Sequence, residues 1–138
     1  MSGTLRVDLV SPTKLLLSET VSMVVVPGTE GYFGVLADHM SFVSSLRPGV
    51  VSVHESVTAP PVKRFFVSGG FAEVNQQACT LLVDEAIPLE ELASQVIEER
   101  RLAAEQKLEA ASTDDDRASA EVALATVSAM EDALSGAA

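Results

Sequence analysis

An Asp-His pair followed by a hydroxyl is the first feature of this sequence that could do chemistry. Asp38, His39 and Ser41 are the residue types of a hydrolytic triad. Neighbouring residues on an extended segment point to opposite sides, so Asp38 is poorly placed to orient the ring of His39. We expect Asp38 to lie in a turn and His39 to be a surface or capping residue. The sequence therefore argues against an enzyme, and we assign no catalytic residue.

Evenly spaced glycines precede this pair, at Gly28, Gly31 and Gly34. Their spacing is not the dinucleotide-binding pattern, and neither the Gly-Lys-Ser/Thr of a phosphate loop nor a helix follows them. We expect them at turns and bulges between strands, where glycine tolerates unusual backbone angles.

The remaining reactive residue types do not suggest a metal site. His39 and His54 are the only histidines, and no Cys or carboxylate cluster around them has metal-ligand spacing. The carboxylate pairs at 84–85 and 90–91 are typical of solvated charge. Cys79 is the one cysteine, so it cannot form an internal disulfide, and we expect it to be buried. The sequence predicts neither a metal nor another cofactor.

The overall charge argues against nucleic acid and anionic lipid as partners. The net charge is −11, the isoelectric point is near 4.4, and the chain has no Trp and one Tyr. Phosphate backbones need a basic surface, and bases need aromatic residues for stacking. The sequence contains no run of 18 apolar residues and no secretory signal, so we expect no membrane insertion and a reducing, cytosolic-type compartment.

Two parts of the chain differ in composition and in hydrophobic period. Residues 1–86 carry a net charge of −3 and most of the Gly and Pro. Their short β-rich runs between turns predict an antiparallel β-sandwich or barrel. A parallel sheet is not expected, because no helix-length crossover separates the runs.

Residues 87–138 carry a net charge of −8 and are rich in Ala and Glu. Their apolar residues recur at helical intervals, Pro88 suits a first helical turn, and a break falls at 112–113. We therefore predict two antiparallel helices in a hairpin that buries little area.

Alternation also predicts which strand residues share a face. One expected face consists of Leu5, Val7 and Leu9, and a second consists of Val21, Met23 and Val25.

Three segments in combination carry a family resemblance: VVPGTEGYFGVLADHMSFVSSLRPGVV, then FFVSGGFAEV, then TLLVDEA. With the order of the strands and the trailing hairpin, the chain resembles the bacterial-type epsilon subunit of the F-type ATP synthase over essentially its whole length. The resemblance implies a β-sandwich of about ten strands in residues 1–86 and a two-helix hairpin in residues 87–138.

The resemblance also implies a function without catalysis. In that family the epsilon subunit sits in the central stalk of the rotor, on the cytoplasmic face of the bacterial inner membrane. Its sandwich lies beside the gamma subunit and on the loops of the c-ring, and it helps couple proton flow to ATP synthesis. Carried over by position, the c-ring contact is expected at Glu30, Gly31, Tyr32, Asp38, His39 and Met40. Some relatives have an acidic residue where this chain has Tyr32, so the contact here either lacks that charge or replaces it by aromatic packing.

In many bacterial relatives the hairpin extends, contacts the alpha and beta subunits and blocks ATP hydrolysis, and some relatives bind ATP through an Ile/Leu-Asp-x-x-Arg-Ala motif. The matching residues here are Leu89, Glu90, Ala93 and Ser94, so the phosphate-binding Arg is lost. Arg117 is the one basic residue of the second expected helix, which is otherwise acidic. We expect little or no inhibition. The alternative is an ATP-responsive inhibitory regulator whose hairpin extends.

Overall fold

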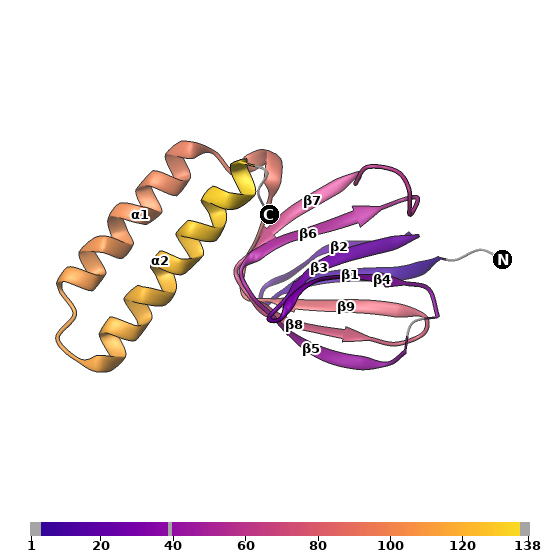
Figure 1. Ribbon diagram of the computed structural model, residues 1–138, viewed down its shortest axis with the longest axis horizontal. Coiled ribbons are helices and arrows are strands. Elements are labelled where there is room, and N and C mark those ends of the chain that lie inside the picture. The colour runs from indigo at the N-terminus through magenta and orange to yellow at the C-terminus, as the bar shows by residue number, and fades with distance from the viewer. Residues whose placement is uncertain (1–3, 39, 136–138) are drawn as a thin grey trace. The chain divides into compact units, whose positions relative to one another are not determined.

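The computed structural model describes residues 4–38 and 40–135, which form two compact units (Figure 1). The first unit is Met1–Pro88 and the second is Leu89–Ala138. This division falls two residues beyond the expected one between 86 and 87. The reason is that Ala86–Pro88 forms a short strand, β10, which pairs with β7 and so belongs to the sandwich.

Short strands make up the first unit, as expected, and ten of them lie in the described residues. They are β1 (Leu5–Ser11), β2 (Lys14–Val21), β3 (Met23–Gly28), β4 (Gly31–Leu36), β5 (Phe42–Leu46), β6 (Gly49–His54), β7 (Lys63–Val67), β8 (Gly70–Val74), β9 (Ala78–Val83) and β10. The strand order is β10-β7-β6-β3-β5-β8-β9-β1-β2, with β4 paired to β3 alongside this path. Nearly all of these pairs are antiparallel, which confirms the predicted fold class.

One pair contradicts the expectation of an entirely antiparallel sheet. Strand β1 runs parallel to β9, with Val7 opposite Cys79 and Leu9 opposite Leu81. A parallel pair needs a long connection between its strands. Here the seven intervening strands provide that connection, so no helical crossover is required.

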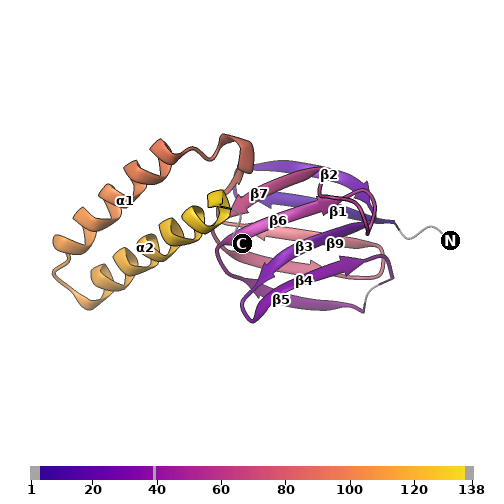
Figure 2. The same ribbon diagram turned by 45° about the horizontal axis from the view of Figure 1, so that its top comes forward.

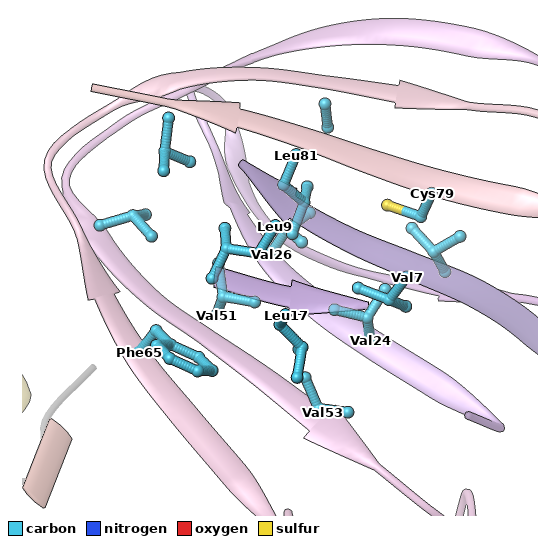
Figure 3. Packing of buried hydrophobic residues seen from close by; sticks show 14 of the residues in the cluster. Val7, Leu9, Leu17, Val24, Val26, Val51, Val53, Phe65, Cys79 and Leu81 are labelled. Atoms are coloured by element: carbon cyan, nitrogen blue, oxygen red, sulfur yellow. The ribbon is translucent and has the colours of Figure 1, made fainter. Parts of the chain in front are cut away.

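The core lies between the two halves of the folded sheet, where aliphatic side chains from both halves point toward one another (Figure 3). The predicted face of Leu5, Val7 and Leu9 is confirmed, since all three are buried in this core. Cys79 is buried there too, as expected, and burial raises the pKa of its thiol to about 12.

The second predicted face was wrong. Residues 20–26 belong to two strands, because β2 ends at Val21 and β3 begins at Met23. In β3 the core-facing residues are Val24 and Val26, which are fully buried, while Met23 and Val25 are only half-buried. The break between the strands shifts the alternation by one residue and so reverses the face.

The second unit is a hairpin of two helices, as predicted. It consists of a 3₁₀ turn at Leu89–Glu91, α1 (Ser94–Glu109) and α2 (Asp114–Ser135). The expected start of the first helix at Pro88 was wrong, because Pro88 ends β10 and α1 begins at Ser94. None of the helices in the described part of the chain is both long and apolar enough to cross a membrane.

Local capping explains where α2 begins. The Thr113 hydroxyl accepts a hydrogen bond from the backbone N–H of Asp116, at 3.0 Å, as an N-cap residue does. Asp114, Asp115 and Asp116 fill the first turn, where the helix dipole favours negative charge.

Candidate functional site

The six residues expected to contact the c-ring are divided between the two ends of strand β4. Glu30 lies in the turn before β4, and Tyr32 is the second residue of the strand. Asp38 and Met40 follow its other end, and His39 lies outside the described residues. The six residues of β4 span about 20 Å at the rise of an extended strand. Figure 2 shows β4 running from one end of the sandwich to the other.

The turn between β3 and β4 is short and presents Glu30 to solvent. Gly28 pairs with Gly31, so the loop contains only Thr29 and Glu30. Gly31 has a φ of 136°, a conformation that favours glycine, as expected for a turn. Gly34 was expected at a turn or bulge and is instead in the middle of β4, in an unbroken ladder with β3.

Tyr32 completes the hydrogen bonding of strand β6. The backbone N–H of the buried residue Val50 donates to the Tyr32 hydroxyl at 3.0 Å. The pairing of β3 with β6 ends at Val25 and Ser52. Continued in that register, Val50 would lie opposite Pro27, whose carbonyl instead accepts from the N–H of Arg47. The Tyr32 hydroxyl therefore accepts a hydrogen bond from a buried backbone N–H that the pairing of β3 with β6 does not satisfy.

Two further contacts hold the Tyr32 ring in place. The guanidinium of Arg47 lies over the ring, 4.8 Å from its centroid, as in a cation–π pair. A Cβ on Gly49 would come within 2.8 Å of the Tyr32 hydroxyl and 2.7 Å of Pro27 Cβ. Tyr32 is thus engaged within the sandwich, and Glu30 is the exposed charged side chain of this turn.

At the opposite end of β4 the expected turn at Asp38 is confirmed. Asp38 has a φ of 62°, and its N–H donates to the carbonyl of Gln76 at 3.0 Å. Asp tolerates this left-handed conformation better than most residues. Two residues later Met40 is 80% exposed, so its thioether side chain is the most prominent apolar group of this loop.

An exposed apolar row crosses the outer surface of the sheet. Phe71 on β8 pairs with Leu82 on β9, Leu82 with Val10 on β1, and Val10 with Leu15 on β2. Phe71, Leu82 and Leu15 are 55%, 49% and 57% exposed. A row of adjacent exposed apolar side chains is typical of a protein–protein interface.

The sequence analysis did not predict this row, although consecutive apolar residues in two strands are a local signal for it. In Leu81-Leu82 and Leu15-Leu16-Leu17, apolar residues stand at consecutive positions, so one of them must leave the core face of its strand. The neighbouring row is polar and includes Asp8, whose carboxylate accepts from the Ser18 hydroxyl at 2.6 Å. That hydrogen bond lowers the pKa of Asp8.

The expected remnant of a nucleotide motif lies at the start of the helical hairpin. Leu89 and Glu90 are in the 3₁₀ turn, and the exposed Ala93 precedes α1. Ser94 lines a cavity of about 340 Å³ at the open end of the hairpin, between the N-terminal end of α1 and the C-terminal end of α2. The other residues lining it are Ile97, Glu98, Arg101, Glu131, Leu134 and Ser135.

The charges in this cavity do not suit phosphate. Arg101 is its one cation, and that guanidinium is bonded to both Glu98 and Glu131. Two carboxylates therefore already neutralise the group that would bind an anion. Among the described residues, no cluster of His, Cys, Asp and Glu could hold a metal ion.

Comparisons with known proteins place this chain among ATP synthase subunits. A family model described as the beta-sandwich domain of the ATP synthase delta/epsilon chain matches residues 4–89. The chain is 46% identical to the ATP synthase epsilon chain of Paramagnetospirillum magneticum, over 87% of this chain and 89% of that one. It is 42% identical to the epsilon chain of Rhodospirillum rubrum, over 94% and 96%.

Solved structures agree with these sequence matches. A chain in the cryo-EM structure of Euglena gracilis mitochondrial ATP synthase, comprising OSCP, F1 and c-ring, is similar with a TM-score of 0.79 and 28% identity, over 97% of this chain and 83% of that one. A chain of the Tetrahymena thermophila mitochondrial enzyme has the same fold, with a TM-score of 0.71, 17% identity and coverage of 94% and 96%. Because its relatives share both the sandwich and the hairpin segments at more than 40% identity, the chain belongs to the ATP synthase epsilon chain family, whose members are non-catalytic subunits.

Proposed function

We propose that this chain is the central-stalk epsilon subunit of a proton-translocating F-type ATP synthase. In this role it joins the gamma subunit to the c-ring, and it helps couple rotation of the ring to ATP synthesis at the cytoplasmic face of the bacterial inner membrane. The names of its relatives and its likeness to a chain from a structure that contains F1 and a c-ring support this assignment.

The exposed apolar row is the observation that carries the proposal. Phe71, Leu82 and Leu15 expose hydrophobic surface in adjacent register, and a subunit that transmits torque needs a stable interface. We assign this row, with Val43 beside it on β5, to the gamma subunit. Val43 is 67% exposed and faces Glu73 in the next row of the same surface.

The turn at Glu30 is the part of the expected ring contact that we assign to the c-ring. It is rigid, because Gly28 and Gly31 close it and Tyr32 is anchored to Val50 and Arg47. In this assignment the contact depends on the shape of the turn and on the Glu30 carboxylate, while Tyr32 positions the turn. In this assignment Tyr32 supports the c-ring contact indirectly, because its packing holds the turn in place.

The segment from Asp38 to Met40 lies at the other end of β4, and we assign it to a separate contact. A turn about 20 Å away cannot share one small ring loop with Glu30. Met40 and Val43 lie on either side of the start of β5, which makes this loop continuous with the apolar surface assigned to gamma.

Charge reversal on the apolar row tests the gamma contact. Leu82→Glu is expected to weaken co-purification with the gamma subunit by tenfold or more, because it places an unpaired charge in a desolvated interface. Val57→Glu is the matched control, since Val57 is similarly exposed but lies in the loop between β6 and β7. Equal binding of both variants to gamma would contradict the assignment.

We propose further that the hairpin inhibits ATP hydrolysis weakly or not at all. Arg117 is the one basic residue in α2, against six carboxylates, which disfavours docking on an acidic surface. Deleting residues 89–138 is expected to change hydrolysis by the assembled complex less than twofold. A several-fold rise would show that the hairpin inhibits.

The ATP-responsive alternative predicts binding to the isolated chain. Because Arg101 is already bonded to two carboxylates, we expect no saturable heat when ATP is titrated to millimolar concentrations. Saturable binding that Arg101→Ala abolishes would favour the regulator instead.

A further inference from the structure

The side of α1 that faces α2 contains one charged residue among apolar residues. Ile97, Arg101, Ala104 and Leu108 follow one another at spacings of four, three and four, which places them on one side of the helix. Ile97 and Ala104 are buried, Leu108 is half-buried, and the Arg101 side chain is only 26% exposed. Arg101 therefore occupies a seam position between the two helices.

Both arms of the Arg101 guanidinium are bonded, and one of them joins the two helices. Its Nη1 donates to Glu98 Oε2 on the same helix, at 2.6 Å, and its Nη2 donates to Glu131 Oε2 on α2. Glu98 and Glu131 are about half exposed. A second bond crosses the hairpin nearer its loop, where Lys107 Nζ donates to the Ser119 hydroxyl at 2.8 Å.

The apolar part of this seam is poorly able to select one alignment of the helices. Three of the six buried residues of the two helices are alanines: Ala104, Ala120 and Ala133. Alanines bury little area, so they add little free energy that could favour one alignment of the helices over another. A polar residue at a seam position can specify register, because the wrong alignment leaves its charge without a partner.

We propose that Arg101, held between Glu98 and Glu131, is an electrostatic clamp that closes the open end of the hairpin and sets its register. The inference concerns the hairpin alone and does not depend on the contacts assigned to gamma or the c-ring. The clamp is built from the chain's own carboxylates, so closure requires no bound ligand. It makes closure sensitive to salt, since added ions screen partly exposed charges.

Distance measurement between the helices of the full-length chain tests the clamp. Nitroxide labels at Gln95→Cys and Ser128→Cys lie on exposed, uncharged positions of α1 and α2, and the buried Cys79 is replaced by Ala. Double electron–electron resonance is expected to give one narrow distance at low salt. In Arg101→Glu, where three carboxylates meet, the ratio of closed to open hairpin is expected to fall by about tenfold.

Charge exchange separates the clamp from a general effect of net charge. The double variant Arg101→Glu/Glu131→Arg restores an ion pair between the helices and is expected to recover the narrow distance. Arg117→Glu changes net charge by the same amount at an exposed site of α2, and it is expected to leave the distance unchanged. Glu131→Gln removes the partner without adding repulsion and is expected to lower the ratio by about threefold.

Three results would overturn the clamp. One is a distance distribution for Arg101→Glu that matches that of Arg117→Glu, and another is a charge exchange that fails to restore closure. The third is a wild-type distribution at 1 M NaCl, where the screening length falls to about 3 Å, that is identical to the one at low salt. If Arg101→Glu does not fold, Glu131→Gln and the salt series still decide the question.

Discussion

Replacing Tyr32 with Phe separates the two roles that this residue could have at the turn of β3 and β4. The change keeps the ring that lies under Arg47 and removes only the hydroxyl that accepts from the N–H of Val50. If Tyr32 acts by direct packing on a partner, the substitution should barely matter. If it completes the sheet, as the geometry indicates, the sandwich should lose stability.

The size of the effect follows from the burial of Val50, which is 6% exposed. Water has poor access to its N–H, so removing the acceptor leaves a buried donor unsatisfied, at a cost of about 1–2 kcal/mol. For a unit of this size that corresponds to a fall in melting temperature of roughly 4–15 °C. The pairing of β6 with β7 is untouched, so the loss should be local.

Three measurements on the purified chain test this reasoning. Guanidinium unfolding gives the change in free energy, thermal unfolding gives the change in melting temperature, and amide hydrogen exchange reports on Val50 directly. We expect the Val50 amide to exchange faster in Tyr32→Phe while the amides bonded between β6 and β7 keep their protection. A free-energy change below about 0.3 kcal/mol with unchanged exchange at Val50 would refute the reasoning.

Three further predictions follow from the packing of the sandwich. Gly49→Ala should destabilise the chain by about 1–3 kcal/mol in urea unfolding, because its Cβ would collide with Pro27 and Tyr32, whereas Gly34→Ala has ordinary room beside Met23 and should not; equal effects would contradict this account. Leu81→Ala, at a fully buried position, should cost about 2–5 kcal/mol in the same assay, and Leu82→Ala on the exposed row less than about 1; a reversed order would place the core on the wrong face. Burial raises the pKa of Cys79 to about 12, so the folded chain keeps the thiol protonated while the unfolded chain ionises near 9. Stability should therefore fall between about pH 9 and 12 by more in the wild type than in Cys79→Ala, and parallel pH profiles would refute it.

Much of the local structure could be predicted from the sequence because its causes are local. Alternation in LRVDLV predicts the buried face of β1, and the helical spacing after Pro88 predicts the hairpin, although not the residue at which its first helix begins. Asp38 was correctly placed in a turn, because residues that tolerate unusual backbone angles identify turns within short segments. The family resemblance rests on the same turns, which is why it was visible in the chain.

Errors arose where a boundary depends on a distant segment. The first helix was expected to begin at Pro88, but pairing with β7 keeps that residue in a strand. The face of β3 was assigned wrongly because the break at Ser22 shifts the alternation. A periodic pattern over a few residues indicates neither which strand will pair with a segment nor where a strand will break.

The sequence by itself determined the class of fold, the two-part organisation and the family, since periodicity, turn residues and composition act over short distances. Only the tertiary structure decided which residues share a surface. It separated Glu30 from Asp38 by the length of β4, aligned Phe71, Leu82 and Leu15 across four strands, and brought the Tyr32 hydroxyl to Val50. Each of these depends on strand register and on a pairing partner far away in the chain, which no short segment encodes.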